Sequence, residues 1–152
     1  MKRKMCFRII FAIMVVGIMA VVFLFSSQSG EESNYLSKGI LEHILTVFHM
    51  NTDPARLDSY NLVLRKIAHF SLYFFLGVGI MGFLLTTPIK INRCLLLSLI
   101  LCVLFAATDE FHQFLLGSRN GNALDVLLDS MGALAGISTL GIWRKIRFPD
   151  LK

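Results

Sequence analysis

Six polar or ionisable side chains crowd around one short turn in the second half of the chain. They are Asp109, Glu110, His112, Gln113, Asp125 and Asp129. Carboxylates and imidazoles at this density could transfer protons as general acids and bases, or hold a divalent cation against a phosphate. Each group closes or opens a strongly apolar run. Because an ionisable group costs about 2.5–3.5 kcal/mol at a membrane centre on insertion scales, these residues need a water boundary, a partner or a function.

A second set of polar residues lies near the start of an earlier apolar run. Lys66, His69 and Tyr73 recur at i, i+3 and i+7, which places them on one face of a helix. Arg119 lies in the turn between the two acidic groups. Arg119 and Lys66, together with Arg65, are candidates for binding phosphate, since arginine presents a planar fork to that anion.

Four apolar runs must position these residues, and each is long enough to cross a bilayer as a helix. They cover residues 7–25, 61–85, 94–116 and 124–143. Hydrophobic residues make up 55% of the 152 residues and charged residues only 16%, which is typical of a membrane protein. The sequence therefore predicts a single-domain, all-α integral membrane protein with a four-helix transmembrane bundle. Nucleic-acid binding is not expected, because the basic residues flank apolar runs and form no stripe.

The loop after the first run contains further helical signals. Residues 33–50 place apolar side chains on one side and polar ones on the other. This pattern predicts an amphipathic helix that lies on the outer leaflet or covers the bundle as a lid. Asp53 and Pro54 have the order of a cap and a first-turn proline, which predicts a further short helix beginning there.

Charge asymmetry predicts the orientation. With both termini in the cytoplasm, ten basic residues lie inside and five outside, which is the bias expected for a bacterial cell-membrane protein. The first run is expected to be an uncleaved anchor, since Phe23, Leu24 and Phe25 provide no small-residue cleavage site. The charge bias therefore predicts that Gln28, Lys66, His69 and the six residues around the turn all lie near the outer surface, whatever the source of the membrane.

Helical rise places the acids at one height. Asp109 follows Arg93 by roughly 24 Å of helix, and Asp129 precedes Arg144 by roughly 22 Å. Asp125, Asp129, Gly132 and Gly136 form one stripe of the last run, and its small residues allow another helix to approach closely. We therefore expect one outward-facing polar pocket inside the bundle.

The candidate residues divide by role. Candidates for catalysis are Asp109, Glu110, His112, Asp129 and His69. Candidates for ligand binding are Arg119, Lys66, Gln113, Tyr73, Gln28 and Asp125. A divalent cation is compatible with the acids, but its identity stays open.

Structural roles compete with these functional ones. Asp125 follows Asn122 by three residues, so it could satisfy amides at a helix N-terminus. His69 could be a hydrogen-bonded core histidine, and Arg65 and Lys66 could snorkel to the interface. The whole set could be a salt-bridged network that fixes the helices. Ion passage is disfavoured, because the inner halves of the runs carry almost no polar residues.

The combined motifs resemble the VanZ family, which is named for a teicoplanin-resistance accessory protein. The resemblance rests on FSSQ at 25–28, RKIAHF at 65–70 with Tyr73, DEFHQ at 109–113, Gly117 and Arg119, and DVLLD at 125–129 with Gly132 and Gly136. Leu72 departs from the family, which often has an acid before the tyrosine. The resemblance implies an envelope role in Gram-positive bacteria and lowered susceptibility to lipoglycopeptides.

Two functions follow as hypotheses. In the first, the pocket binds or acts on an outer-leaflet, lipid-linked peptidoglycan precursor, or meets a glycopeptide antibiotic. No reaction is implied, because no serine has a pattern that marks it as an activated nucleophile. In the second, the chain is a non-enzymatic membrane accessory protein whose polar network is structural.

Overall fold

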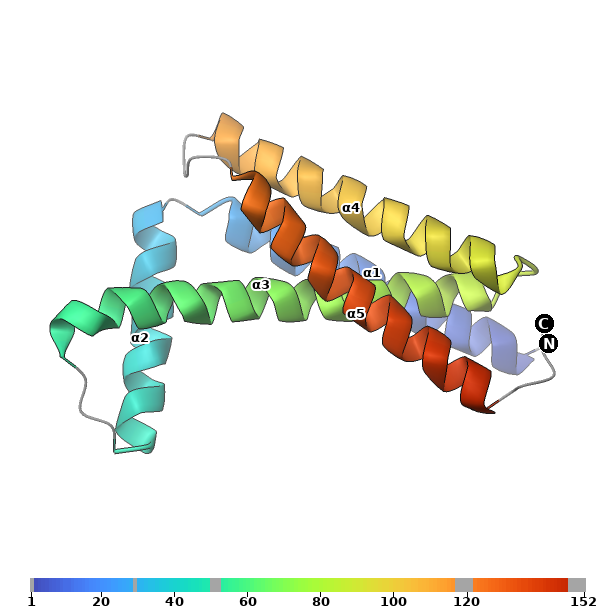
Figure 1. The fold of residues 1–152 in the computed structure, drawn as a ribbon, viewed down its shortest axis with the longest axis horizontal. Coiled ribbons are helices and arrows are strands. Elements are labelled where there is room, and N and C mark those ends of the chain that lie inside the picture. The colour runs from blue at the N-terminus through green and yellow to red at the C-terminus, as the bar shows by residue number, and fades with distance from the viewer. Residues whose placement is uncertain (1, 29, 50–52, 117–121, 148–152) are drawn as a thin grey trace.

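The computed structural model describes residues 2–28, 30–49, 53–116 and 122–147, and over these residues the secondary structure is entirely helical (Figure 1). Five helices form in this part of the chain: α1 (Lys2–Ser26), α2 (Gly30–Val47), α3 (Pro54–Leu85), α4 (Ile91–Leu115) and α5 (Ala123–Arg147). Four of those described helices, α1, α3, α4 and α5, are long and apolar enough to cross a membrane. The prediction of an all-α chain with four spans is confirmed.

The predicted boundaries need three corrections. The short helix expected to begin at Pro54 is not separate, because α3 runs without a break from Pro54 to Leu85. The last span continues past residue 143 to Arg147, and the first begins at Lys4 within a helix that starts at Lys2. Apolar runs mark the membrane core, whereas the helices extend beyond it because nothing in the flanking charged residues breaks a helix.

Local chemistry explains where helices begin and end. Asn122 caps α5, since its Oδ1 accepts a hydrogen bond from the Leu124 backbone N–H at 3.1 Å. At the end of α3, the hydroxyls of Thr86 and Thr87 donate to the carbonyls of Phe83 and Leu84 at 2.7 and 2.5 Å. Pro88 follows and cannot continue a helix.

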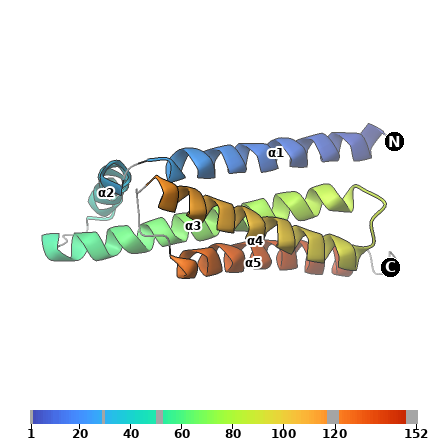
Figure 2. The same ribbon diagram turned by 90° about the horizontal axis from the view of Figure 1, so that it is seen from above.

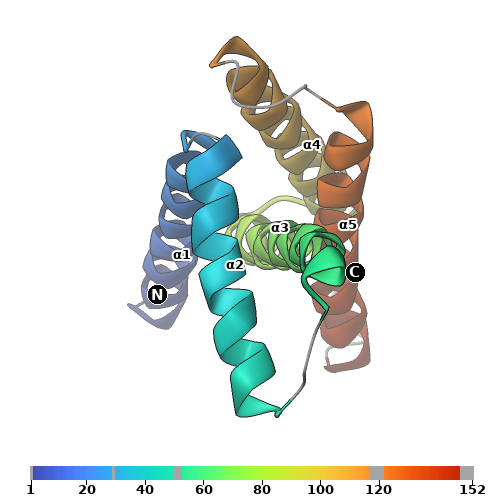
Figure 3. The ribbon, with the colours of Figure 1, turned by 90° about the vertical axis from the view of Figure 1, so that its left-hand side faces the viewer.

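The four long helices run along one bundle, and α2 crosses it at one end (Figures 1 and 2). We call this the capped end; α1 and α4 finish there, and α5 begins there. Viewed from that end, α2 passes across α1 and α3 (Figure 3). The opposite end, which we call the terminal end, holds the start of α1, the turn from α3 to α4 and the end of α5.

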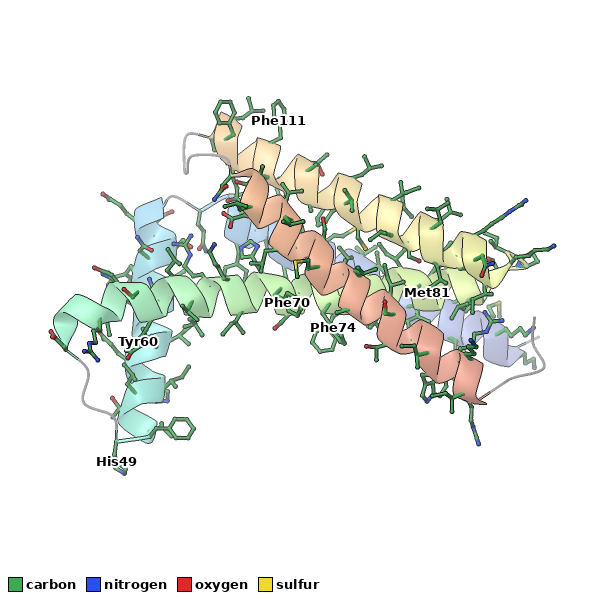
Figure 4. All side chains as sticks on the ribbon, in the orientation of Figure 1. His49, Tyr60, Phe70, Phe74, Met81 and Phe111 are labelled. Carbon is green, nitrogen blue, oxygen red and sulfur yellow. The ribbon has the colours of Figure 1, made fainter. Side chains whose placement is uncertain are left out.

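The closest helix pair is α3 with α5, and glycines make it possible. A Cβ atom at Gly132 would meet the backbone carbonyl of Phe70, and one at Gly136 would meet that of Phe74, where α5 crosses α3 (Figure 4). Gly77 on α3 packs in the same way against the backbone of Ala133. The prediction that the glycine stripe faces another helix is confirmed. Because Asp129 lies on the same stripe, it too faces α3.

The buried core is small and lies between these helices. Its largest fully buried side chains include Tyr73, Leu76 and Met81 on α3, with Ile137 on α5 and Val22 on α1. Large apolar side chains on the outer faces are exposed, for example Ile13, Leu104 and Leu127. A helix bundle with an apolar exterior satisfies its backbone internally and suits contact with lipid chains.

Candidate functional site

A cavity of about 640 Å³ lies at the capped end. Helices α2, α3, α4 and α5 all contribute to its wall, which is lined by Asn34, Lys38, Asp58, Asn61, Leu62, Arg65, Lys66, His69, Glu110, Gln113, Asp125, Leu128 and Asp129. This volume falls within the range of roughly 300–1,000 Å³ that is usual for ligand sites. Most lining residues are polar or charged, which is unusual among otherwise apolar helices.

Three titratable residues from three helices meet at the floor of the cavity: His69 and Asp129 line it, and Asp109 lies against these two without lining it. His69 of α3 places Nδ1 3.6 Å from Oδ2 of Asp129 on α5. Asp109 of α4 approaches both, so that one donor atom from each residue lies within 4.8 Å of the other two. Asp109 and Asp129 are only 6% and 4% exposed. We refer to His69, Asp109 and Asp129 as the floor triad.

Asp109 is held in place by a buried amide. Gln113, one helical turn later on α4, donates from Nε2 to Asp109 Oδ2 at 3.1 Å. The same nitrogen donates to the hydroxyl of Ser26 at the end of α1, also at 3.1 Å. A carboxylate whose orientation is fixed in this way loses little rotamer entropy when it binds a ligand.

Basic side chains lie at the rim, which is wetter than the floor. Lys66 Nζ lies 3.4 Å from Asp125 Oδ1, and both side chains are nearly half exposed. The Arg65 guanidinium donates to Asn34 Oδ1 at 2.7 Å, which ties α3 to α2. Lys38 on α2 forms an ion pair with Asp58 on α3 at 2.6 Å. The three cations therefore surround the opening.

Glu110 and Asp125 stabilise the start of α5 in different ways. Glu110 Oε1 accepts a hydrogen bond from the Asn122 backbone N–H at 2.6 Å. Because the Asn122 side chain already caps the helix, the Asp125 carboxylate is available to Lys66. The helix-capping role considered for Asp125 is therefore filled by Asn122. Asp125 still lies in the first turn of α5, where the helix dipole stabilises its charge.

The family model described as VanZ/LLP1 matches residues 11–144. The chain belongs to the VanZ/LLP1 family. Neither a curated protein nor a solved structure matches it. A family match over nearly the whole chain, together with four apolar helices, makes this a multi-pass membrane protein.

Five predicted site residues of this VanZ/LLP1 member are not among those that line the cavity. Asp109 lies against the lining residues His69 and Asp129. His112 faces α1, where its ring stacks on Phe23 at 4.8 Å between centroids and Nε2 lies 3.3 Å from Ser27 Oγ. Gln28 is half-buried beside a separate depression at the start of α2. Tyr73 is fully buried one turn along α3 from His69. Arg119 lies outside the described residues.

Several residues of the VanZ/LLP1 site were not predicted as candidates, among them Asn34, Lys38, Asp58 and Asn61 in the cavity lining and Ser26 beside Gln113. Asn61 is 3% exposed and donates to Asn34 Oδ1 at 3.4 Å, and Ser26 is 4% exposed beside Gln113. Asn61 could have been found, since it continues the Tyr73, His69 and Arg65 face backward by one turn. Asn34 had no such signal, because only tertiary folding brings α2 across α3.

The cations of the cavity all lie at the rim, where Lys38 and Lys66 are paired with the exposed acids Asp58 and Asp125 and Arg65 is bonded to Asn34. The buried floor triad has two carboxylates and one imidazole. An anionic head group would bind at the rim by charge-assisted hydrogen bonds. Carboxylates and an imidazole within reach of it could move protons or bind a cation.

Proposed function

We propose that the cavity of this VanZ/LLP1 protein binds the phosphate-bearing head group of an outer-leaflet, lipid-linked cell-wall intermediate. The observation that supports it best is the cluster of three basic side chains at the opening of one 640 Å³ cavity at the end of a membrane bundle. Arg65 and Lys66 together offer a fork and a point charge, the two donors that bind phosphate in proteins. Binding of this intermediate would lower susceptibility to lipoglycopeptides such as teicoplanin.

The orientation belongs to the same proposal. We place both termini in the cytoplasm and the capped end outside, because ten basic residues then lie inside and five outside. The start of α1 and the end of α5 share the terminal end, as an even number of spans requires (Figure 2). The capped end then meets the outer leaflet, where lipid-linked wall intermediates are used.

Helix α2 supports a membrane-surface position for the cavity. Its polar side contacts the bundle through Asn34 and Lys38, while Leu36, Ile40 and Ile44 are exposed on the other side. An exposed apolar stripe on a helix that crosses the bundle end fits an interfacial helix in the head-group region. A lipid could then present its phosphate beneath α2 without leaving the bilayer.

Acid–base chemistry on the bound head group is the enzymatic form of the proposal. Asp109, Asp129, His69 and Glu110 are close enough to the cavity to exchange protons with a ligand. His112 and Arg119 remain candidates from sequence: the former would act through the contact of α4 with α1, and the latter as a phosphate-binding fork.

A structural network is the second candidate function, and the ion pairs favour it. Lys38–Asp58, Lys66–Asp125 and His69–Asp129 each join two different helices. In that case the chain would be an accessory protein that presents a surface to a partner, and loss of the pairs would lower stability without affecting ligand binding.

Binding to full-length protein in nanodiscs tests the two functions against each other. A polyprenyl phosphate should bind saturably, and the polyprenyl alcohol of equal chain length should not. Lys66→Gln should weaken phosphate binding by at least tenfold while the protein stays monodisperse. Lys90→Gln, an exposed lysine at the terminal end, is the matched control and should bind normally. Equal affinity for alcohol and phosphate would reject a head-group site.

Thiol labelling of intact cells tests the orientation. In a background without native cysteines, Tyr35→Cys on α2 should react with an impermeant reagent, since Tyr35 is 82% exposed at the capped end. Ile146→Cys, at a residue 77% exposed at the terminal end, should react only after lysis. The reverse pattern would place the cavity on the cytoplasmic side.

A further inference from the structure

The floor triad has more negative charge than its described surroundings balance. Lys38 and Lys66 are occupied by Asp58 and Asp125, and Arg65 is bonded to Asn34. Among residues 2–28, 30–49, 53–116 and 122–147, the base placed against Asp129 is His69, and Asp109 receives an amide hydrogen bond from Gln113. With both carboxylates ionised, the triad would retain at least one net negative charge inside the bundle even if the imidazole were protonated. Such a charge is costly unless a cation joins it.

One carboxylate oxygen of Asp129 has no partner in the part of the chain that the structure describes, and a cation could bind to it. Asp129 is 4% exposed, yet its Oδ1 has no hydrogen-bond partner among the described residues. Its other oxygen, Oδ2, is the atom that lies 3.6 Å from His69. Because a buried carboxylate oxygen normally accepts a hydrogen bond, this oxygen is left free for a ligand.

We propose that His69, Asp109 and Asp129 hold one divalent metal ion, and that the ion is Zn²⁺. The triad offers one imidazole nitrogen and two carboxylate oxygens, a donor set that suits zinc, whereas Mg²⁺ and Ca²⁺ take oxygen ligands. Three protein ligands leave a fourth position open, as in zinc sites that bind water or substrate. With a neutral imidazole, the ion balances both carboxylates.

The spacing of the triad needs only a modest contraction. Ligands at about 2.0–2.1 Å from a tetrahedral zinc lie roughly 3.3 Å apart. His69 and Asp129 are already 3.6 Å apart, and the widest separation in the triad is within 4.8 Å. The widest pair would have to approach by roughly 1.5 Å, which rotation of the two side chains could supply.

The open position gives the ion a role at the proposed phosphate site. His69 and Asp129 line the cavity directly, so a fourth ligand would come from the cavity side. An oxygen of the phosphate head group fits that position, with Arg65 and Lys66 contacting the remaining oxygens. This part of the inference rests on the proposed function, whereas zinc binding itself does not.

Gln113 would act as a positioning residue for the ion. It orients Asp109 through a 3.1 Å hydrogen bond and is itself tied to Ser26. Outer-shell partners of this kind typically change metal affinity by about 10–100-fold. Gln113→Leu should therefore weaken zinc binding by that factor, and Gln113→Glu, which replaces the donating nitrogen with an oxygen and adds charge beside Asp109, should not restore the wild-type affinity.

The deciding experiment is a zinc titration of chelator-stripped, full-length protein in detergent, in competition with a chromophoric chelator and without lipid. One equivalent should bind, and Asp109→Asn, Asp129→Asn and His69→Gln should each weaken binding at least 100-fold. Glu42→Gln, at an exposed acid of α2 that does not line the cavity, should leave the affinity unchanged. The proposal would be overturned if zinc did not bind saturably, or if the three triad variants bound zinc with the same affinity as the wild type.

A measurement on the wild-type protein tests the zinc site even if the variants do not fold. X-ray absorption of the zinc-loaded protein should show oxygen and nitrogen neighbours near 2.0 Å with the outer-shell scattering of one imidazole. A spectrum without imidazole would overturn the assignment. Failure here is distinct from failure of the proposed function, because polyprenyl phosphate binding is judged separately by the Lys66→Gln comparison.

Discussion

The two ends of the bundle use charge in opposite ways. At the capped end, ionisable groups of both signs meet across helices, as in Lys66–Asp125 and His69–Asp129. At the terminal end, the charges are basic and exposed, as at Lys4, Lys90 and Arg147. Charges at the terminal end act through their sum on the membrane side they occupy. Those at the capped end act only through their positions.

The polar side chains at the two ends also differ in burial. Asp109, Gln113 and Asp129 at the capped end are each less than a tenth exposed, so they need partners in fixed geometry. Exposed basic residues can be hydrated without any partner. We therefore expect substitutions to be tolerated at the terminal end and to alter folding or binding at the capped end.

The largest effect should follow from separating α5 from α3. Gly132→Leu would press a side chain onto the Phe70 carbonyl, a backbone atom that cannot rotate away. Overpacking costs about 1–3 kcal/mol or more, and it would also pull Asp129 from His69. Folding yield and thermal stability in detergent should fall sharply. Leu134→Ala, at a residue 48% exposed on the same helix, is the control and should change stability by about 0.5 kcal/mol or less.

A large loss of binding without a loss of folding is expected at the floor. Asp109→Asn and Asp129→Asn keep the shape of the side chain and remove its charge, so monodispersity should survive while polyprenyl phosphate binding in the presence of zinc falls at least tenfold. Lys145→Gln at the terminal end should bind normally. If both aspartate variants fail to fold, the network is structural and the accessory function is correct. Normal binding would show that the floor is incidental.

A smaller effect is expected when an arginine loses its planar guanidinium but keeps its positive charge. Arg65→Lys keeps the positive charge but loses the planar donor that reaches Asn34, so phosphate affinity should fall about three- to tenfold. Arg119→Lys tests the same chemistry in the neighbouring turn. Arg93→Lys at the terminal end should have no effect, because only its charge matters there. Equal affinity in Arg65→Lys would restrict that residue to a general electrostatic role.

The smallest effect should appear at the outermost ion pair. The Lys38 and Asp58 side chains are 37% and 75% exposed, so a double-mutant cycle with Lys38→Met and Asp58→Asn should give a coupling of about 0.2–1 kcal/mol. Added salt should reduce it. A coupling well above that range, unaffected by salt, would show that α2 is held to α3 more tightly than an exposed pair allows.

Much of the fold was readable from sequence because membrane helices carry their signal locally. Runs of apolar residues set the four spans, and the stripe of Gly132 and Gly136 set the face of α5 that meets another helix. Their outer limits were less readable, since Lys2 and Arg147 belong to helices although they lie beyond the apolar core. The start expected at Pro54 is confirmed, but the break expected between that short helix and the span beginning near residue 61 is wrong, because helix continuity does not follow hydropathy.

The candidate site was predictable only in part. The sequence brought Asp109, Gln113, Asp129, His69 and Lys66 to one end of the bundle, and the structure gathers them there. It could not tell that His112 turns toward Phe23, because one helical position rotates a side chain by about 100° and only the packing of α1 against α4 fixes that angle.

The sequence by itself determined the number of spans, the family and the crowding of polar groups at one end, since each depends on composition or on spacing along a single helix. The tertiary structure decided which groups face one another. Asn34 reaches Arg65 and Asn61 only because α2 folds across α3, and the floor triad exists only because three helices converge. Contacts between helices depend on crossing angles and close approach, which are set by glycine packing between chain segments far apart in sequence.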